Sequence, residues 1–202
     1  MLSTRFNFLF IHTPKTGGNA IQRVLLPFSD DEMALVQPFH DGIDRFEIRS
    51  PVLNIHKHSS LQDYQRQLPP EVFARVFKFT CVRNPWDRCV SFFFSPHRGK
   101  VEWSPDAFHS FIADHVAPQS DYLALQGQSC SPFDNLDTVL RFETLHADFV
   151  ALCQRLGLAC AALPVANASR RGPYQQYYGN PATADLVRQK FAPEIERFGY
   201  RF

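Results

Sequence analysis

One short segment near the start of the chain constrains its fold more than any other. Residues 6–11 form an apolar, aromatic-rich run that is typical of a buried strand, and apolar residues then recur at helical spacing over residues 21–28. Between them lies the sequence Pro14-Lys-Thr-Gly-Gly18. A strand that ends in a glycine-containing turn and restarts as a helix directs free backbone N–H groups and the positive end of the helix dipole toward one point. The segment therefore predicts a loop that binds phosphate or sulfate, to which Lys15 adds a cation and Thr16 a hydroxyl donor.

The order of residues in this loop differs from the Walker A pattern of P-loop nucleotide kinases. That pattern is Gly-x-x-x-x-Gly-Lys-Ser/Thr, whereas here Lys15 precedes the glycines and the strand contains no earlier Gly. A kinase of that type also needs Mg²⁺ and an acidic residue directly after an apolar strand. None of the strands expected here ends in such an Asp, which counts against the P-loop-type nucleotide kinase but leaves it open as an alternative.

The composition indicates one folded domain over residues 1–202. The chain has 202 residues with 45% hydrophobic content, which is enough for a substantial core. Its formal net charge is only +1, so no overall field attracts nucleic acid or an anionic membrane. We expect no nucleic-acid partner, and any site for a polyanion must be local.

Cysteine usage and the start of the chain bear on its location. The five cysteines include no Cys-x-x-Cys pair and no histidine at zinc-binding spacing, so we expect reduced, mostly buried thiols and no metal site. The first strand begins within six residues, which leaves no room for a signal peptide. No apolar run approaches the ~20 residues of a membrane span. We therefore expect a cytoplasmic protein without a membrane span.

Strand and helix signals alternate along the rest of the chain. Strands are expected at residues 51–55, 76–82 and 138–142, and helices at 61–68, 86–94, 105–116, 145–156 and 181–198. The helix starts carry capping residues, namely Ser59 or Ser60, Asn84-Pro85, Ser104-Pro105 and Asn180-Pro181. Residues 27–51 are polar and punctuated by prolines, which predicts a loop with little regular structure. Since no hairpin signal is present, the alternation predicts an α/β fold, an open parallel sheet flanked by helices.

A second group of polar residues follows the strand expected at 76–82. Arg83 leaves that strand at its carboxyl end, and Ser91 lies about two turns into the next helix. A guanidinium fork and a hydroxyl can therefore converge on one phosphate. Asp87 and Arg88 either pair with each other to hold the helix entry or contact the ligand, and the residues alone leave both interpretations open.

Together these two segments resemble sulfotransferases that use 3′-phosphoadenosine 5′-phosphosulfate (PAPS). Pro14-Lys-Thr-Gly-Gly18, after a strand ending in Ile-His, is similar to their 5′-phosphosulfate loop. Arg83-Asn-Pro-Trp-Asp-Arg88, with Ser91 eight residues after Arg83, is similar to their 3′-phosphate motif. The chain looks most like the carbohydrate branch that includes heparan sulfate 2-O- and 6-O-sulfotransferases.

The resemblance covers most of the chain, with further matches at Val139-Leu-Arg-Phe-Glu143 and at the terminal Phe198-Gly-Tyr-Arg-Phe202. Residues 27–52 and 94–128 match nothing that we can assign. A family of this kind builds its acceptor pocket in such regions. A chain this short for the family implies an acceptor site that is open or is completed by a partner or a homodimer.

The resemblance implies a P-loop-like sulfotransferase fold and in-line transfer of a sulfuryl group from PAPS to an acceptor hydroxyl, which releases 3′-phosphoadenosine 5′-phosphate (PAP) and requires no metal. It assigns the 3′-phosphate to Arg83 and Ser91, and it gives Lys15 the catalytic task of neutralising charge on the bridging oxygen as PAP leaves. It assigns the 5′-phosphosulfate to Pro14, Lys15, Thr16, Gly17, Gly18, Asn19 and Ala20. Arg170 and Arg171 resemble a basic segment that closes over the 3′-phosphate, although a solvated basic turn explains them equally well.

The segment His56-Lys57-His58-Ser59-Ser60-Leu61 resembles the catalytic histidine segment of the same family. On this match His58 is the general base and His56 an auxiliary, and if the segment is extended both rings face the cleft. Histidine titrates near pH ~6.5, so it can accept the proton of an alcohol. Two surface histidines beside a solvated Lys57 are the alternative, and His12 is a competing base that we expect to support the loop instead.

Two features of the function stay open at this point. The acceptor can be a sugar, a lipid, a peptide or a small alcohol. A PAP-binding module that has lost catalysis would show the same phosphate motifs, so it stands beside the nucleotide kinase as a second alternative.

Overall fold

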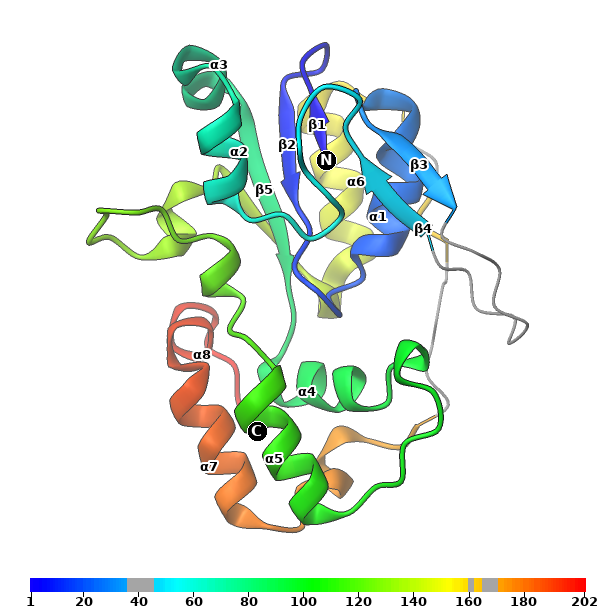
Figure 1. The fold of residues 1–202 in the computed structure, drawn as a ribbon, viewed down its shortest axis with the longest axis vertical. Helices are drawn as coiled ribbons and strands as arrows, with labels where there is room; N and C mark the ends of the chain where they lie inside the picture. Colours follow the sequence, from blue (N-terminus) through cyan, green and yellow to red (C-terminus); the bar gives the residue numbers. More distant parts are fainter. Residues whose placement is uncertain (36–45, 160–161, 165–170) are drawn as a thin grey trace.

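The computed structural model describes residues 1–35, 46–159, 162–164 and 171–202, with a four-stranded sheet at its centre (Figure 1). The strand order is β1 (Leu2–Ser3), β2 (Phe8–Ile11), β5 (Phe77–Val82) and β6 (Thr138–Arg141). Strands β2, β5 and β6 are parallel, and β1 adds an antiparallel edge. The predicted α/β fold, with a parallel sheet flanked by helices, is confirmed.

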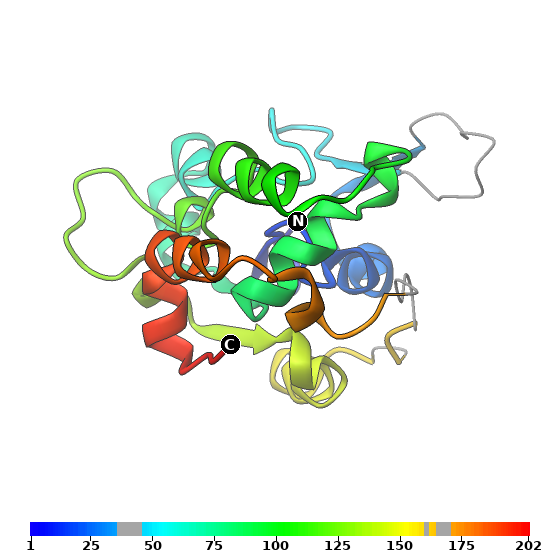
Figure 2. The same cartoon turned by 90° about the horizontal axis from the view of Figure 1, so that it is seen from below.

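Helices cover both faces of this sheet because side chains alternate along the buried strands. Phe8 and Phe10 of β2 pack with α1 (Gly18–Leu25) and α6 (Leu145–Leu156). Leu9 and Ile11 belong to the opposite core, with α2 (Leu61–Gln67). That core continues into α4 (Pro85–Phe93), α5 (Pro105–His115) and α7 (Pro181–Lys190). Figure 2 looks at the carboxyl ends of the strands and shows α4 lying across them, with α1 and α6 at its side.

The helix starts follow from local capping chemistry, as predicted. Ser60 forms a capping box with Asp63 at α2, and Asn84 accepts from the backbone N–H of Trp86 at α4. Ser104 and Asn180 cap α5 and α7 in the same way. Each side-chain oxygen satisfies an N–H group that has no partner within the helix. These caps place the beginning of α4 directly after the carboxyl end of β5.

The prediction of an irregular segment over residues 27–51 is wrong. Strands β3 (Glu32–Leu35) and β4 (Phe46–Arg49) pair antiparallel, and residues 36–45 between them lie outside the described residues. Phe46 and Ile48 are buried while Arg49 is exposed, so β4 follows the two-residue period of a half-buried strand. Four residues are too short a run to outweigh the turn signals around them.

The short strand expected at residues 51–55 does not form. The backbone N–H groups of Val52 and Leu53 donate to Ser50 Oγ, and that of Asn54 donates to Gln67 Oε1. Side chains therefore take the hydrogen bonds that a strand would give to a neighbouring strand.

Prolines explain two further differences. Pro70 begins an additional helix, α3 (Pro70–Arg75), because proline suits the first helical position. The single helix expected over residues 181–198 is divided at Phe191 into α7 and α8 (Ala192–Phe198). Pro193 lacks the N–H group that would continue α7, and in a continuous helix its ring would clash with the carbonyl oxygen of the residue four positions earlier.

The cysteines differ from the expectation at one position. Cys81, Cys89 and Cys130 are free thiols, but Cys153 is disulfide-bonded, and Cys160 lies outside the described residues. Spacing along the chain does not reveal such a bond, because pairing requires the two sulfur atoms to meet in the fold. Among the helices of the described part of the chain, none has the length and apolar character needed to cross a membrane.

Candidate active site

A cavity of about 750 Å³ lies at the carboxyl ends of β2 and β5, where the helices α1 and α4 begin. It brings together ten of the predicted site residues: Pro14, Lys15, Gly17, Gly18, Asn19, Ala20, His58, Arg83, Ser91 and Arg171. Thr16 and His56 do not line it, and Arg170 lies outside the described residues.

The loop before α1 is shaped by two residues in the left-handed region. Lys15 has φ 70° and Gly17 has φ 85°. A Cβ on Gly17 would lie 2.8 Å from Leu145 Cδ2, so glycine meets both a conformational and a packing demand there. Gly17 provides no side-chain cap for α1, and no acidic side chain lies in the first turn. The positive end of this helix therefore faces the cavity without a counter-charge of its own.

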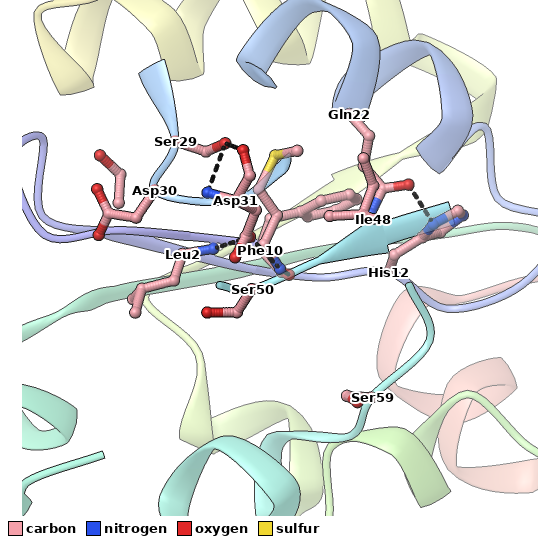
Figure 3. A network of polar contacts seen from close by, with 12 residues as sticks. Leu2, Phe10, His12, Gln22, Ser29, Asp30, Asp31, Ile48, Ser50 and Ser59 are labelled. Carbon is pink, nitrogen blue, oxygen red and sulfur yellow. Dashed lines mark hydrogen bonds and ion pairs between the residues drawn. The ribbon is translucent and has the colours of Figure 1, made fainter. Parts of the chain in front are cut away.

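His12 packs directly beneath this loop. A Cβ on Gly18 would lie 2.1 Å from His12 Cδ2, so the ring occupies the space that any side chain at position 18 would need. The His12 ring stacks on Phe10 with centroids 5.8 Å apart, and its Nδ1 lies 3.0 Å from Gln22 Oε1 (Figure 3). Burial, followed by the nearby His58 and Lys57, lowers the pKa of His12 well below its usual value. His12 is therefore neutral, and its Nδ1–H donates to the Gln22 amide oxygen.

Thr16, which we expected to contact the ligand, and Arg88, whose role the sequence left open, both form internal hydrogen bonds. The hydroxyl of Thr16 is fully buried and donates to the Thr13 carbonyl oxygen at 2.8 Å, while Thr13 donates to the Cys81 carbonyl oxygen at 2.9 Å. These bonds tie the loop to β5, so the Thr16 hydroxyl is not the donor to a ligand that we expected. Arg88 is also fully buried, and its Nε donates to the Pro14 carbonyl oxygen at 2.9 Å. Adjacent residues on a helix point in different directions, which is why Arg88 does not pair with Asp87.

Lys15 is the cation of the loop. Its Nζ donates to Ser95 Oγ at 3.3 Å. Burial, and then the positive charges of Arg83 and Arg171, lower its pKa to about 8. Lys15 is therefore mainly protonated at neutral pH, and a bound anion would raise its pKa.

Arg83 is held from three sides at the end of β5. Its Nη1 donates to the Lys15 carbonyl oxygen at 3.1 Å, and its Nε and Nη2 lie 2.8 Å and 2.6 Å from Asp87 Oδ2. The guanidinium carbon lies 3.8 Å from the centre of the Phe142 ring. Burial lowers the pKa of Arg83, and Asp87 acts in the opposite direction. Ser91 lies one helical turn beyond Asp87 and also lines the cavity.

His58 reaches the cavity from the turn before α2. Its Nδ1 donates to the carbonyl oxygen of His12 at 2.9 Å, and the centroids of the two rings are 4.4 Å apart. Because the carbonyl can only accept, the proton sits on Nδ1 and the lone pair of the neutral ring is on Nε2. Burial is the main reason that the pKa of His58 is lowered from its usual value. The ring is therefore neutral at neutral pH and can accept a proton at Nε2.

His56 does not join His58, and the expectation that both rings face the cleft is wrong. Residues 57–58 form a turn in which the Ser59 N–H donates to the His56 carbonyl oxygen at 3.0 Å, so the segment is not extended. The His56 Nδ1 lies 2.9 Å from Ser59 Oγ. His56 lines a second cavity of about 480 Å³, together with Arg49 and Asn54.

Lys57 lies between these two histidines and is not the solvated lysine considered above. Its Nζ donates to the Phe46 carbonyl oxygen at 3.0 Å and lies 3.7 Å from the centre of the Phe46 ring. Burial lowers its pKa to about 8. This contact depends on β4, which the sequence analysis did not predict.

Several other polar residues belong to the site but were missed, among them His97, His146 and Ser95. His97 and His146 line the cavity, and Ser95 receives Lys15. His146 follows the strand expected at 138–142, and the shared carboxyl edge of parallel strands was a usable signal for it. Ser95 and His97 lie in a region without a recognisable motif. Over the described ranges, no group of three or more His, Cys, Asp or Glu side chains is arranged to hold a metal ion.

The chain is similar to known sulfotransferases in sequence pattern. A search of curated proteins finds no match to this chain. Among solved structures, mouse sulfotransferase SULT7A1 complexed with PAP is similar over 96% of this chain and 67% of that chain, with 18% sequence identity and a TM-score of 0.38. The model of the Sulfotransferase family matches residues 1–201, which is nearly the whole sequence. This match confirms the sulfotransferase resemblance, whereas the carbohydrate branch stays a prediction: the chain belongs to the sulfotransferase family.

Proposed function

We propose that residues 1–202 form a single catalytic domain that transfers the sulfuryl group of PAPS to the hydroxyl of a carbohydrate or other alcohol and releases PAP. One observation carries this proposal. A single cavity is lined by the loop before α1, the Arg83 fork and His58, whose Nε2 has no hydrogen-bond partner among the described residues. These are a site for the 5′-phosphosulfate, a site for a 3′-phosphate and a base for the acceptor.

The 5′-phosphosulfate binds the loop formed by residues 14–20. Its oxygens accept from backbone N–H groups at the start of α1, where the helix dipole adds a positive potential. Lys15 lies beside them and, with a pKa of about 8, carries a proton at neutral pH. As the S–O bond to PAP breaks, charge grows on the bridging oxygen, and the Lys15 ammonium stabilises it. Lys15, Arg83 and Arg171 provide the positive charge, so the proposed reaction requires no metal ion.

His58 acts as the general base. The acceptor oxygen attacks sulfur, the S–O bond to PAP breaks, and the acceptor proton passes to His58 Nε2. The resulting imidazolium keeps its Nδ1–H on the His12 carbonyl oxygen, which favours the charged form. The His12 ring lies under Gly18 with its Nδ1 on Gln22, so it supports the loop and is the weaker candidate. His56 opens into the second cavity and has no direct part in this step.

The 3′-phosphate binds Arg83, Ser91 and Arg171. Arg83 lies directly before Asn84, the N-cap of α4, and Ser91 lies about two turns along that helix; both line the cavity with Arg171. A guanidinium fork matches phosphate geometry better than an ammonium does. This site gives the protein its preference for a nucleotide that carries a 3′-phosphate.

The assignment of the base is tested by single-turnover sulfate transfer from PAPS at fixed pH, with PAP affinity measured alongside. The acceptor is first chosen by screening sugars, lipids, peptides and small alcohols with mass spectrometry. His58→Asn keeps a donor for the His12 carbonyl oxygen but removes the base, so its rate should fall by ~10²–10⁴ with PAP affinity nearly unchanged. His56→Ala should keep close to normal transfer.

Other outcomes would redirect the proposal. A His58→Asn variant with near-normal transfer would remove His58 as the base, and a selective loss of rate in His12→Ala would assign the role to His12. Binding of PAP by the wild type without any transfer would indicate an inactive PAP-binding module. Stabilisation by ATP that depends on Mg²⁺, with PAP inert in the same thermal-shift assay, would favour the nucleotide kinase.

A further inference from the structure

We infer that Asp87 is a positioning residue that holds Arg83 and Arg171 together as one 3′-phosphate site. The inference rests on the proposed function, because it concerns the nucleotide that the cavity takes. Asp87 itself is an anion and has no attraction for a phosphate. Its contribution acts through the two arginines that it contacts.

Asp87 occupies one edge of the Arg83 guanidinium and leaves other donors available. Arginine has donors on Nε, Nη1 and Nη2, with two N–H bonds on each terminal nitrogen. The Nε and Nη2 contacts go to Asp87 Oδ2, and an Nη1 contact goes to the Lys15 carbonyl oxygen. Among the described residues, these bonds leave one N–H on each terminal nitrogen of Arg83. A phosphate can therefore bind while Asp87 still holds the side chain in place.

The second oxygen of the same carboxylate holds Arg171. Asp87 Oδ1 lies 2.5 Å from Arg171 Nη2, and the Asp87 carbonyl oxygen lies 3.4 Å from the same nitrogen. The two guanidinium groups are close enough for Arg171 to lower the pKa of Arg83. Asp87 offsets this repulsion at a partly buried place, where the Arg171 and Asp87 side chains are only 10% and 22% exposed.

The contact between Asp87 and Arg171 joins α4 to residues 171–175, which form one wall of the cavity. Residues 171–175 line the cavity, and Arg171 is 84 positions from Asp87 in the sequence. The other end of this wall is anchored separately, because Tyr178 Oη donates to the Trp86 carbonyl oxygen at 2.8 Å. Asp87 thus acts at the cavity end of the segment. Without it, Arg171 loses a contact that holds it beside Arg83.

The position of Asp87 on α4 suits this role. It lies four residues before Ser91, so these two side chains share one face of the helix, and Arg83, which lies just before the N-cap, reaches the same carboxylate. The carboxylate therefore sits between the fork and the hydroxyl that receive the phosphate. We expect nucleotides with a 3′-phosphate to depend on Asp87, and nucleotides without one to be indifferent to it.

Calorimetric titration of PAP and of adenosine 5′-monophosphate (AMP) into each variant tests this role. The wild type should prefer PAP, and Asp87→Asn should reduce the ratio of the two affinities by about tenfold with AMP affinity unchanged. Asp87→Glu keeps the charge and should retain most of the preference. Asp134→Asn is the matched control, since Asp134 pairs with Arg197 at 2.9 Å on the exposed surface, and it should keep the wild-type ratio.

Hydrogen exchange provides a second readout that needs no ligand. Amides of residues 172–178 should exchange faster in Asp87→Asn than in the wild type, and Asp134→Asn should leave them unchanged. If Asp87→Asn does not fold, Asp87→Ser replaces it, because serine is well tolerated in the first turn of a helix.

The outcomes separate this inference from the proposed function. A wild type that does not prefer PAP to AMP contradicts the proposed 3′-phosphate site itself. A wild type that prefers PAP, with a variant that keeps the full ratio, contradicts only the role of Asp87. Equal loss of PAP and AMP affinity would show that Asp87 serves the fold in general, and it would also overturn the inference.

Discussion

The two anion sites that we propose for the cavity are built from different parts of the chain. The 5′ loop is made of consecutive residues, 14–20, and depends on main-chain geometry with positive φ at Lys15 and Gly17. The 3′ site is made of side chains that come together in the fold, namely Arg83 and Arg171 around Asp87. Ligand binding at a site built from backbone should be weakened by substitutions that add side-chain volume. Binding at a site built from side chains should be weakened by substitutions that remove a charge.

The two sites also meet at one atom. The Lys15 carbonyl oxygen, in the 5′ loop, accepts from Arg83 Nη1 of the 3′ site at 3.1 Å. Arg83 therefore has two roles in the proposal. Its remaining N–H groups bind the 3′-phosphate, and its Nη1 supports the backbone of the 5′ loop. Substitutions in each site show how far the two sites are independent.

The largest effect is expected from adding a single methyl group to the 5′ loop. In Gly18→Ala the new Cβ would lie 2.1 Å from His12 Cδ2, so the ring or the loop must move. Overpacking of this kind costs about 1–3 kcal/mol of unfolding free energy, and a misplaced loop should slow sulfate transfer by roughly a hundredfold or more. Chemical unfolding and single-turnover transfer measure the two effects. Gly179→Ala, where nothing lies within 4 Å, is the control. A fully active Gly18→Ala variant would contradict the packing argument.

The next effect tests the 3′ site through its charge. Arg83→Ala should weaken PAP binding on the order of tenfold to a hundredfold, because hydrogen bonds to a charged phosphate are lost. Adenosine 5′-phosphosulfate lacks the 3′-phosphate and should lose less affinity, since only the contact with the Lys15 carbonyl oxygen affects it. Calorimetry with both ligands measures the difference. Equal losses would mean that Arg83 serves the loop rather than a 3′-phosphate.

A smaller effect should appear as a pH dependence of the 5′ loop. Lys15 has a pKa of about 8 in the free protein, and a bound anion raises that pKa because it favours the charged form. Binding therefore takes up a proton above pH 8, so PAPS affinity should be nearly constant below that pH and fall above it, by up to about tenfold per pH unit.

A pair of variants identifies the group that titrates. Lys57 also has a pKa of about 8, but its Nζ is held by Phe46. Lys57→Met should keep the fall in PAPS affinity above pH 8, and Lys15→Met should remove it. If Lys57→Met alone flattens the profile, the proposed role of Lys15 is wrong.

The smallest effect is expected at Ser95, which contacts the Lys15 ammonium. Ser95→Ala removes the 3.3 Å hydrogen bond from Lys15 Nζ but leaves the backbone of the loop intact. A single net hydrogen bond corresponds to a loss of about twofold to tenfold in transfer rate. Ser131→Ala is the control, because Ser131 makes no side-chain cap and lies outside the cavity. A loss comparable to that of Gly18→Ala would show that side chains govern the 5′ loop as well.

Local sequence determined the framework of the site. The strand before Pro14, the glycines after it and the Asn84-Pro85 start of α4 were all predicted from residues that are neighbours in the chain. Their signals are strong because backbone conformation, capping and the two-residue alternation of strands depend on nearby residues. The pair β3 and β4 was missed because both short strands contain charged residues and lie among turn signals, whereas the equally short β2 is an uninterrupted apolar run.

Only the tertiary structure decided which side chains face the cavity. The turn at residues 57–58 separates His56 from His58, Thr16 turns inward onto the Thr13 carbonyl oxygen, and Asp87 meets Arg171 from 84 positions away. Residue type and spacing indicate which chemistry is available, but the direction of a side chain depends on what packs against it. Those neighbours come from distant segments, and no local pattern encodes them.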